Sequence, residues 1–111
     1  MKYITHNDAH ENINTNRTHL QGAIVCTFAD LINTFGNPMK DGYDDEKSDA
    51  EWQVQFENGT VATIYNWKNG KNYCGNRGLE VWEITEWHIG GHEFDCVHYV
   101  RNAVAQAKET A

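Results

Sequence analysis

The chain has 111 residues and a mass of 12.7 kDa, the size of one domain, and its 40% hydrophobic and 12% aromatic residues exclude a disordered chain. Sixteen acidic residues against nine Lys and Arg give a formal net charge of −7, which opposes nonspecific binding to nucleic acid or to an anionic membrane. Residues 23–26 are the longest apolar run, too short to span a membrane, and residues 1–8 lack a signal peptide's apolar stretch. We therefore expect a protein of the cytoplasm.

The first residues are predicted to form an arm that precedes the folded domain. Residues 1–5 have the composition of a short strand. Residues 6–19 are rich in Asn and His, with Ile13 as their one large apolar residue, so this segment can bury little surface by itself. We expect residues 1–19 to be a strand and arm, and residues 20–111 to be a single domain.

The domain is predicted to begin with a strand over residues 20–26 and a helix over residues 28–35. Apolar residues recur along one face of the helix at the spacing of helical turns. Thr27 and Asp30 have the spacing of a capping box at its start. Gly36 is suited to the left-handed position that ends a helix.

A hairpin is predicted from two alternating segments, residues 51–57 and 60–68. Between them lies Asn58-Gly59, the favoured sequence of a two-residue turn. Closure through two residues would place Trp52 opposite Tyr65, on one face of the sheet.

A third strand is predicted over residues 81–89 and a second helix over residues 93–109. Alternation along this strand puts large apolar residues on both faces: Trp82 and Ile84 on one, Trp87 and Ile89 on the other. The order β-α-β-β-β-α predicts an α+β domain with a three- to four-stranded antiparallel sheet and two helices. Because helices on one side would leave one apolar pair in water, we expect a homodimer, unless the N-terminal arm covers that face within one chain.

Two sets of residues are candidates for binding. Aromatic rings stack on nucleobases, and Lys, Arg and amide groups hold phosphate or ribose oxygens. A Gly-Gly pair that enters a helix exposes backbone donors suited to an anion. The candidate ligand-binding residues are Tyr65, Trp67, Lys68, Tyr73, Asn76, Arg77, His88, Gly90 and Gly91. The alternative is that these aromatic side chains pack beneath the helices.

The second set is an acidic run within residues 41–51. It consists of Asp41, Asp44, Asp45, Glu46 and Asp49, next to Glu51. Spaced carboxylates of this kind can mimic a phosphate backbone and engage the cationic groove of a nuclease. A solvated loop is the alternative, since the run lacks the glycine and the alternating ligands of a calcium loop.

The sequence favours a protein without catalytic machinery. It contains neither the nucleophile elbow of serine hydrolases nor the glycine-rich loops of nucleotide enzymes. His88, His92, Cys96 and His98 are residue types that bind zinc, but their spacing matches no standard site. We therefore expect neither a metal nor another cofactor.

Four segments carry a resemblance to a known family. They are FADLINTFG at residues 28–36, DAEW at 49–52, GTVATIYNWK at 59–68 and WHIGG at 87–91. Together they resemble a family of small tailed-bacteriophage proteins over about residues 20–105. Phage accessory proteins of this size are often counter-defence factors, which inhibit CRISPR or restriction nucleases or sequester nucleotide immune signals. The resemblance carries no functional residue over to this chain.

These observations lead to three expectations of function. The first is a non-enzymatic counter-defence protein that sequesters a nucleotide-derived immune signal. The second is an inhibitor that binds a host defence protein, a nuclease complex, through the acidic run. The third is a small metal-dependent hydrolase that uses His88, His92 and Cys96.

Overall fold

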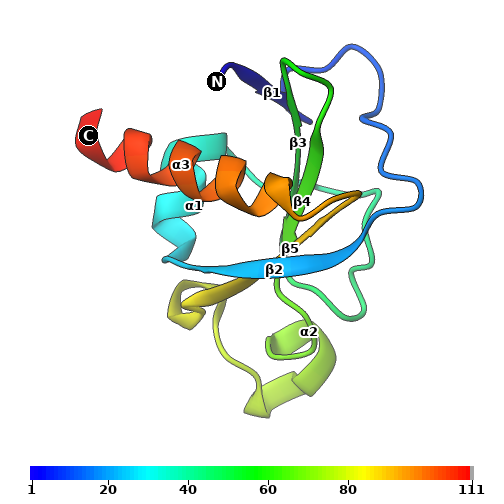
Figure 1. The fold of residues 1–111 in the computed structure, drawn as a ribbon. Helices are drawn as coiled ribbons and strands as arrows, with labels where there is room; N and C mark the ends of the chain where they lie inside the picture. Colours follow the sequence, from blue (N-terminus) through cyan, green and yellow to red (C-terminus); the bar gives the residue numbers. More distant parts are fainter. Residues whose placement is uncertain (111) are drawn as a thin grey trace.

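Five segments of the chain pair into one antiparallel sheet with the strand order β1-β3-β4-β5-β2 (Figure 1). This computed structural model describes residues 1–110. The strands are β1 (Tyr3–Thr5), β2 (His19–Val25), β3 (Glu51–Phe56), β4 (Val61–Tyr65) and β5 (Glu86–Gly91). The helices are α1 (Phe28–Phe35), α2 (Lys71–Cys74) and α3 (Asp95–Thr110), with 3₁₀ turns η1 (Gly75–Arg77) and η2 (Val81–Glu83). The predicted α+β class is confirmed, with more strands than expected.

Helices α1 and α3 lie on the same side of the sheet (Figure 1), and the hydrophobic core fills the space between. Trp52 of β3 and Trp87 of β5 are fully buried there, with ring centroids 5.5 Å apart. Phe28 of α1 packs on both rings, at 5.7 and 6.2 Å. We call this the helix face of the sheet, and the opposite side the outer face.

The predicted start and end of α1 are confirmed. The Asp30 backbone N–H donates to Thr27 Oγ1 at 3.0 Å, and the Thr27 N–H donates to Asp30 Oδ2 at 2.9 Å, which completes the capping box. Gly36 ends the helix with φ +83°, and its N–H donates to the Ile32 carbonyl. This short helix is therefore closed at both ends by its own residues.

The predicted hairpin exists, but its predicted register is wrong by one residue. It closes through three residues, 57–59, because Gly59 takes φ +89° and follows a type I turn. Trp52 consequently pairs with Ile64 rather than with Tyr65. Trp52 and Tyr65 therefore lie on opposite faces of the sheet, which corrects the expectation that they share one.

The predicted strand over residues 81–89 is also wrong in its first half. Residues 81–83 form the 3₁₀ turn η2, and β5 begins only at Glu86. Trp82 therefore lies outside the sheet and is 69% exposed, whereas Ile84 is buried in the core. We expected a homodimer because Trp82 and Ile84 were predicted to lie on one strand, and they do not. Dimerisation itself stays a prediction.

The N-terminal arm folds back on its own chain. Asn7 Nδ2 donates to the Phe35 and Asn37 carbonyls, at 3.3 and 2.9 Å. Ile13 is 6% exposed, and the Asn16 carbonyl is 2.9 Å from His92 Nε2. The arm therefore packs within one chain, which was the alternative to a dimer.

Candidate ligand-binding cavity

The outer face of the sheet carries polar side chains in two rows that cross neighbouring strands. The strand register places Glu51, Tyr65 and His88 in one row, and Gln53, Thr63 and Gly90 in the next. Directly opposed residues of antiparallel strands have Cβ atoms about 5 Å apart, so each row forms a continuous surface.

An open cavity of about 400 Å³ lies over these rows. Its floor includes Glu51, Thr63, Tyr65, His88 and Gly90. Its walls are Thr15, Thr18, His19 and Leu20 from the arm and β2, Asp44 and Ser48 from the acidic loop, and Trp67 after β4. Residues from distant parts of the sequence therefore meet at this cavity.

Gly90 allows the Thr63 hydroxyl to approach the backbone closely at the floor of the cavity. A Cβ atom at this position would lie 2.5 Å from Thr63 Oγ1 and 3.5 Å from Tyr65 Cε1. The Thr63 hydroxyl already occupies the place of a side chain at Gly90, and the rings of Tyr65 and His88 meet edge to face with centroids 5.6 Å apart. The room for a ligand is therefore the open volume above these residues.

The charged residues that line the cavity are acidic. Burial raises the pKa of Glu51, the nearby charge of Asp44 raises it further, and a hydrogen bond of 2.9 Å from Gln53 Nε2 opposes this effect. Burial and the charge of Glu51 also raise the pKa of the Tyr65 hydroxyl. The floor is thus suited to groups that donate hydrogen bonds, and not to anions.

The cations lie at the rim of the cavity, around Trp67. Lys47 Nζ and Lys68 Nζ lie 5.5 and 5.7 Å from the Trp67 ring centroid, and Lys68 Nζ is 5.3 Å from that of Tyr73. Tyr65 meets Trp67 edge to face at 6.0 Å. Lys68 has φ +58°, an uncommon conformation for a residue with a side chain. We call Lys47, Trp67, Lys68 and Tyr73 the aromatic rim.

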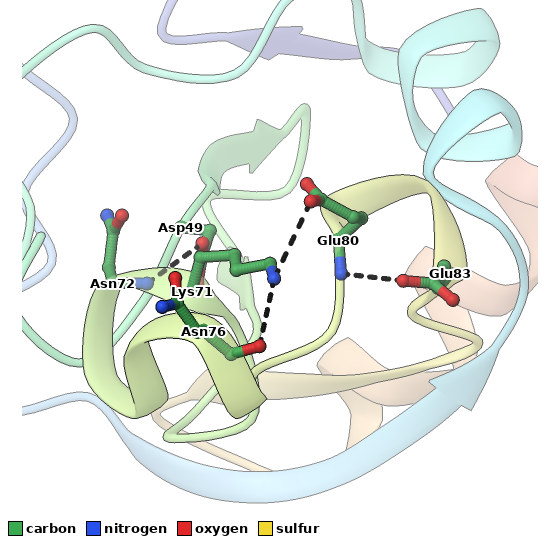
Figure 2. Close-up of polar contacts among 6 residues, drawn as sticks. All are labelled: Asp49, Lys71, Asn72, Asn76, Glu80 and Glu83. Carbon is green, nitrogen blue, oxygen red and sulfur yellow. Dashed lines mark hydrogen bonds and ion pairs between the residues drawn. The ribbon is translucent and has the colours of Figure 1, made fainter.

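Asn76 and Arg77 do not reach this cavity. They lie in η1, next to α2, in a lobe that is held together by its own contacts (Figure 2). Lys71 Nζ donates to the Asn76 carbonyl at 3.2 Å and lies 3.7 Å from the Glu80 carboxylate. The Glu80 N–H in turn donates to Glu83 at 2.9 Å. The structure therefore does not bring Asn76 and Arg77 together with Tyr65 in this cavity.

The buried amide of Asn66 joins this lobe to the acidic loop. Its Oδ1 accepts from the Asp49 and Ala50 N–H groups at 2.8 and 3.1 Å. Its Nδ2 donates to Asp49 Oδ1 at 2.9 Å and to Asn69 Oδ1 at 3.0 Å. Asp49 also accepts from the Asn72 N–H at 3.2 Å (Figure 2). The sequence did not single out this structural role.

The acidic run does not form one surface. Asp49 is committed to internal hydrogen bonds, and Asp44 lines the cavity and lies 3.5 Å from Lys47. Asp41, Asp45 and Glu46 remain exposed on the loop.

The sheet separates His88 from Gly91 and Cys96. A Cβ atom at Gly91 would lie 2.5 Å from Cys96 Sγ on the helix face, so Gly91 does not belong to the cavity. Cys96 is fully buried, and burial raises the pKa of its thiol to about 11. His88 lies on the outer face, and His92 contacts the arm. Within residues 1–110 there is no cluster of three metal-ligating side chains.

The cavity therefore gathers Tyr65, Trp67, His88 and Gly90 from the predicted ligand set, with Lys68 and Tyr73 at its rim. The sequence did not predict the other lining residues as ligand contacts. They are Thr15, Thr18, His19, Leu20, Ser48, Glu51 and Thr63. With the correct register, Glu51 and Thr63 would have been found beside Tyr65 and His88.

Comparisons with known proteins do not assign the chain to a family. No protein-family model matches it, and a search of curated proteins finds no significant match. In residues 1–110, no helix is both long and apolar enough to cross a membrane.

Proposed function

We propose that this chain is a non-enzymatic binding protein that holds a nucleotide-like small molecule in the outer-face cavity. The observation that carries the proposal is the combination of an open cavity of about 400 Å³ with the aromatic rim. This volume lies within the range of small-molecule sites, about 300–1,000 Å³.

The rim offers two of the contacts that a nucleotide needs. Trp67 is 38% exposed, so a planar base can reach its ring and stack on it by displacing a lysine side chain from the ring face. Lys47 and Lys68 place two ammonium groups over that ring, where they can attract phosphate oxygens. A nucleotide whose base stacks on Trp67 and whose phosphate lies near Lys47 and Lys68 keeps its negative charge away from the acidic floor.

The proposed biological role is sequestration. A protein that binds a nucleotide immune signal without converting it lowers the free concentration of that signal in proportion to its own amount. This part of the proposal is supported by the resemblance to phage counter-defence proteins. It predicts that protection of a phage by this chain disappears when the signal is in molar excess over the protein.

Isothermal titration calorimetry against the 5′-ribonucleotides and ADP-ribose tests the binding proposal. We expect at least one of these ligands to bind, and Trp67→Ala to weaken binding by about 5- to 150-fold, the usual effect of losing one aromatic stack. Trp82→Ala is the matched control, because Trp82 is 69% exposed and does not line the cavity. Absence of binding by every ligand, or equal losses in the two variants, would contradict the proposal.

A further inference from the structure

We propose that the acidic floor of the cavity binds the free 2′,3′-diol of a ribose, so that the ligand is a ribonucleotide with both of these hydroxyls unesterified. This inference rests on the proposed function and specifies which part of the nucleotide enters the cavity.

Negative and positive charge are separated in the cavity. Asp44 and Glu51 are the residues with formal charge that line the cavity, whereas Lys47 and Lys68 lie at its rim. A phosphate on the floor would face two carboxylates, which is unfavourable. The floor must therefore receive an uncharged part of the ligand that donates hydrogen bonds.

Glu51 provides an acceptor on the floor. Gln53 Nε2 donates to Glu51 Oε2 at 2.9 Å, which orients the carboxylate and leaves Oε1 able to accept from a ligand. Hydroxyl groups donate strong, charge-assisted hydrogen bonds to a carboxylate oxygen. A sugar diol supplies two such donors on adjacent carbon atoms, and the Thr63 hydroxyl and the His88 ring lie in the same floor as further partners.

There is open space above the floor. Gly90 lies between Thr63 and the Tyr65 ring, and a Cβ atom there would come within 2.5 Å of Thr63 Oγ1. Glycine at this position lets the Thr63 hydroxyl lie directly on the floor, and the open volume of about 400 Å³ above it has room for a non-planar group such as a sugar ring.

The two ends of the cavity lie close together. Glu51 is directly opposite Tyr65 in the sheet, and the Tyr65 ring is 6.0 Å from the Trp67 ring. The proposed diol site and the proposed stacking site are therefore neighbours, as the ribose and the base of a nucleotide are.

The inference narrows the class of ligand. Ribonucleoside 5′-phosphates and ADP-ribose have a free diol and fit the floor. Deoxynucleotides lack one of the hydroxyls, and 3′,5′-cyclic or 2′,3′-cyclic phosphates have one or both esterified. We expect these compounds to bind more weakly.

The test compares each 5′-ribonucleotide with its 2′-deoxy and 2′,3′-dideoxy counterparts by calorimetry on the full chain. We expect the tightest-binding ribonucleotide to lose at least about tenfold in affinity when both hydroxyls are removed, as befits hydrogen bonds to a charged acceptor. Glu51→Gln should weaken ribonucleotide binding by a similar factor and abolish the preference over the dideoxy form. Glu46→Gln is the control, because Glu46 is exposed on the neighbouring loop and does not line the cavity.

The outcomes separate the two proposals. Equal affinity for ribonucleotides and dideoxynucleotides overturns the diol site and leaves the proposed function standing. A preference for ribonucleotides that survives Glu51→Gln also overturns the assignment of Glu51. Absence of binding by all nucleotides overturns the proposed function and the diol site together. The comparison of ligands on the unaltered chain decides the question even if Glu51→Gln does not fold.

Discussion

At the scale of single residues, Glu51 is a carboxylate that the fold holds at an energetic cost. It is partly buried on the outer face, and burial, together with the nearby charge of Asp44, raises its pKa above the ordinary 4.5. A raised pKa means that the folded chain binds a proton more readily than the unfolded chain does. The contribution of Glu51 to stability is therefore largest below its unfolded pKa and is lost as pH rises through its folded pKa. Such a cost at neutral pH is typical of a functional position.

Glu51→Gln should make the protein more stable at neutral pH, because the amide keeps the contact with Gln53 and carries no charge to desolvate. The gain should vanish at pH values below 4.5, where the wild-type carboxyl is protonated in both states. Urea unfolding of both proteins at several pH values measures this, with exposed Glu46→Gln as the control. A stability difference that is independent of pH would show that desolvation of Glu51 is not its cause.

Residue types were sufficient to single out part of the cavity lining and insufficient for the rest. Tyr65, Trp67, His88 and Gly90 were predicted because aromatic rings and glycines beside strand ends are typical of ligand contacts, and they line the cavity. Gly91 instead lies on the helix face, since neighbouring residues of a strand point to opposite faces. Composition alone does not reveal which of two adjacent glycines faces the cavity.

At the scale of elements, α1 shows how far local sequence determines structure. Eight residues are too few for a stable helix in isolation, so α1 depends on its cap and on its packing against the core. The capping box, the apolar stripe and Gly36 all agree on its bounds, and for this reason its prediction is confirmed.

Removing the cap should lower the stability of the whole domain. Thr27→Ala eliminates the acceptor of the Asp30 N–H and should reduce the free energy of unfolding by about 1 kcal/mol. Thr27→Ser retains the hydroxyl and should remain close to the wild type in the same denaturation experiment. Equal losses in the two variants would mean that the Thr27 methyl group, and not the cap, is responsible.

Two other elements show why local sequence was not enough. Asn58-Gly59 is compatible with a two-residue turn and also with a three-residue loop that ends in a left-handed glycine, and the chain adopts the latter. Residues 81–85 have a composition suited to a strand, but Glu80 and Glu83 cap a 3₁₀ turn instead. The wrong register and the wrong strand start each assigned side chains to the wrong face of the sheet or to the sheet when they lie outside it.

At the scale of the whole molecule, the cavity depends on contacts between distant parts of the chain. The arm, the acidic loop, the sheet and Trp67 all line it, and Asn66 fixes the loop to the end of β4. Alternating patterns predicted the α+β class, because each segment reveals its own buried face. No such pattern shows where the arm and the loop come to rest, and these segments build the walls of the cavity.

An NMR titration of ¹⁵N-labelled protein with the tightest-binding 5′-ribonucleotide tests the central claim most directly, because it locates the ligand in the fold. The account predicts amide shift changes concentrated at residues 63–67 and 88–90 and in the cavity-lining part of the arm, residues 15–20. The hairpin loop at 57–59 and the second half of α3 should be unaffected. No shift changes, or changes centred on η1 or on the helix face of the sheet, would contradict a ligand site on the outer face.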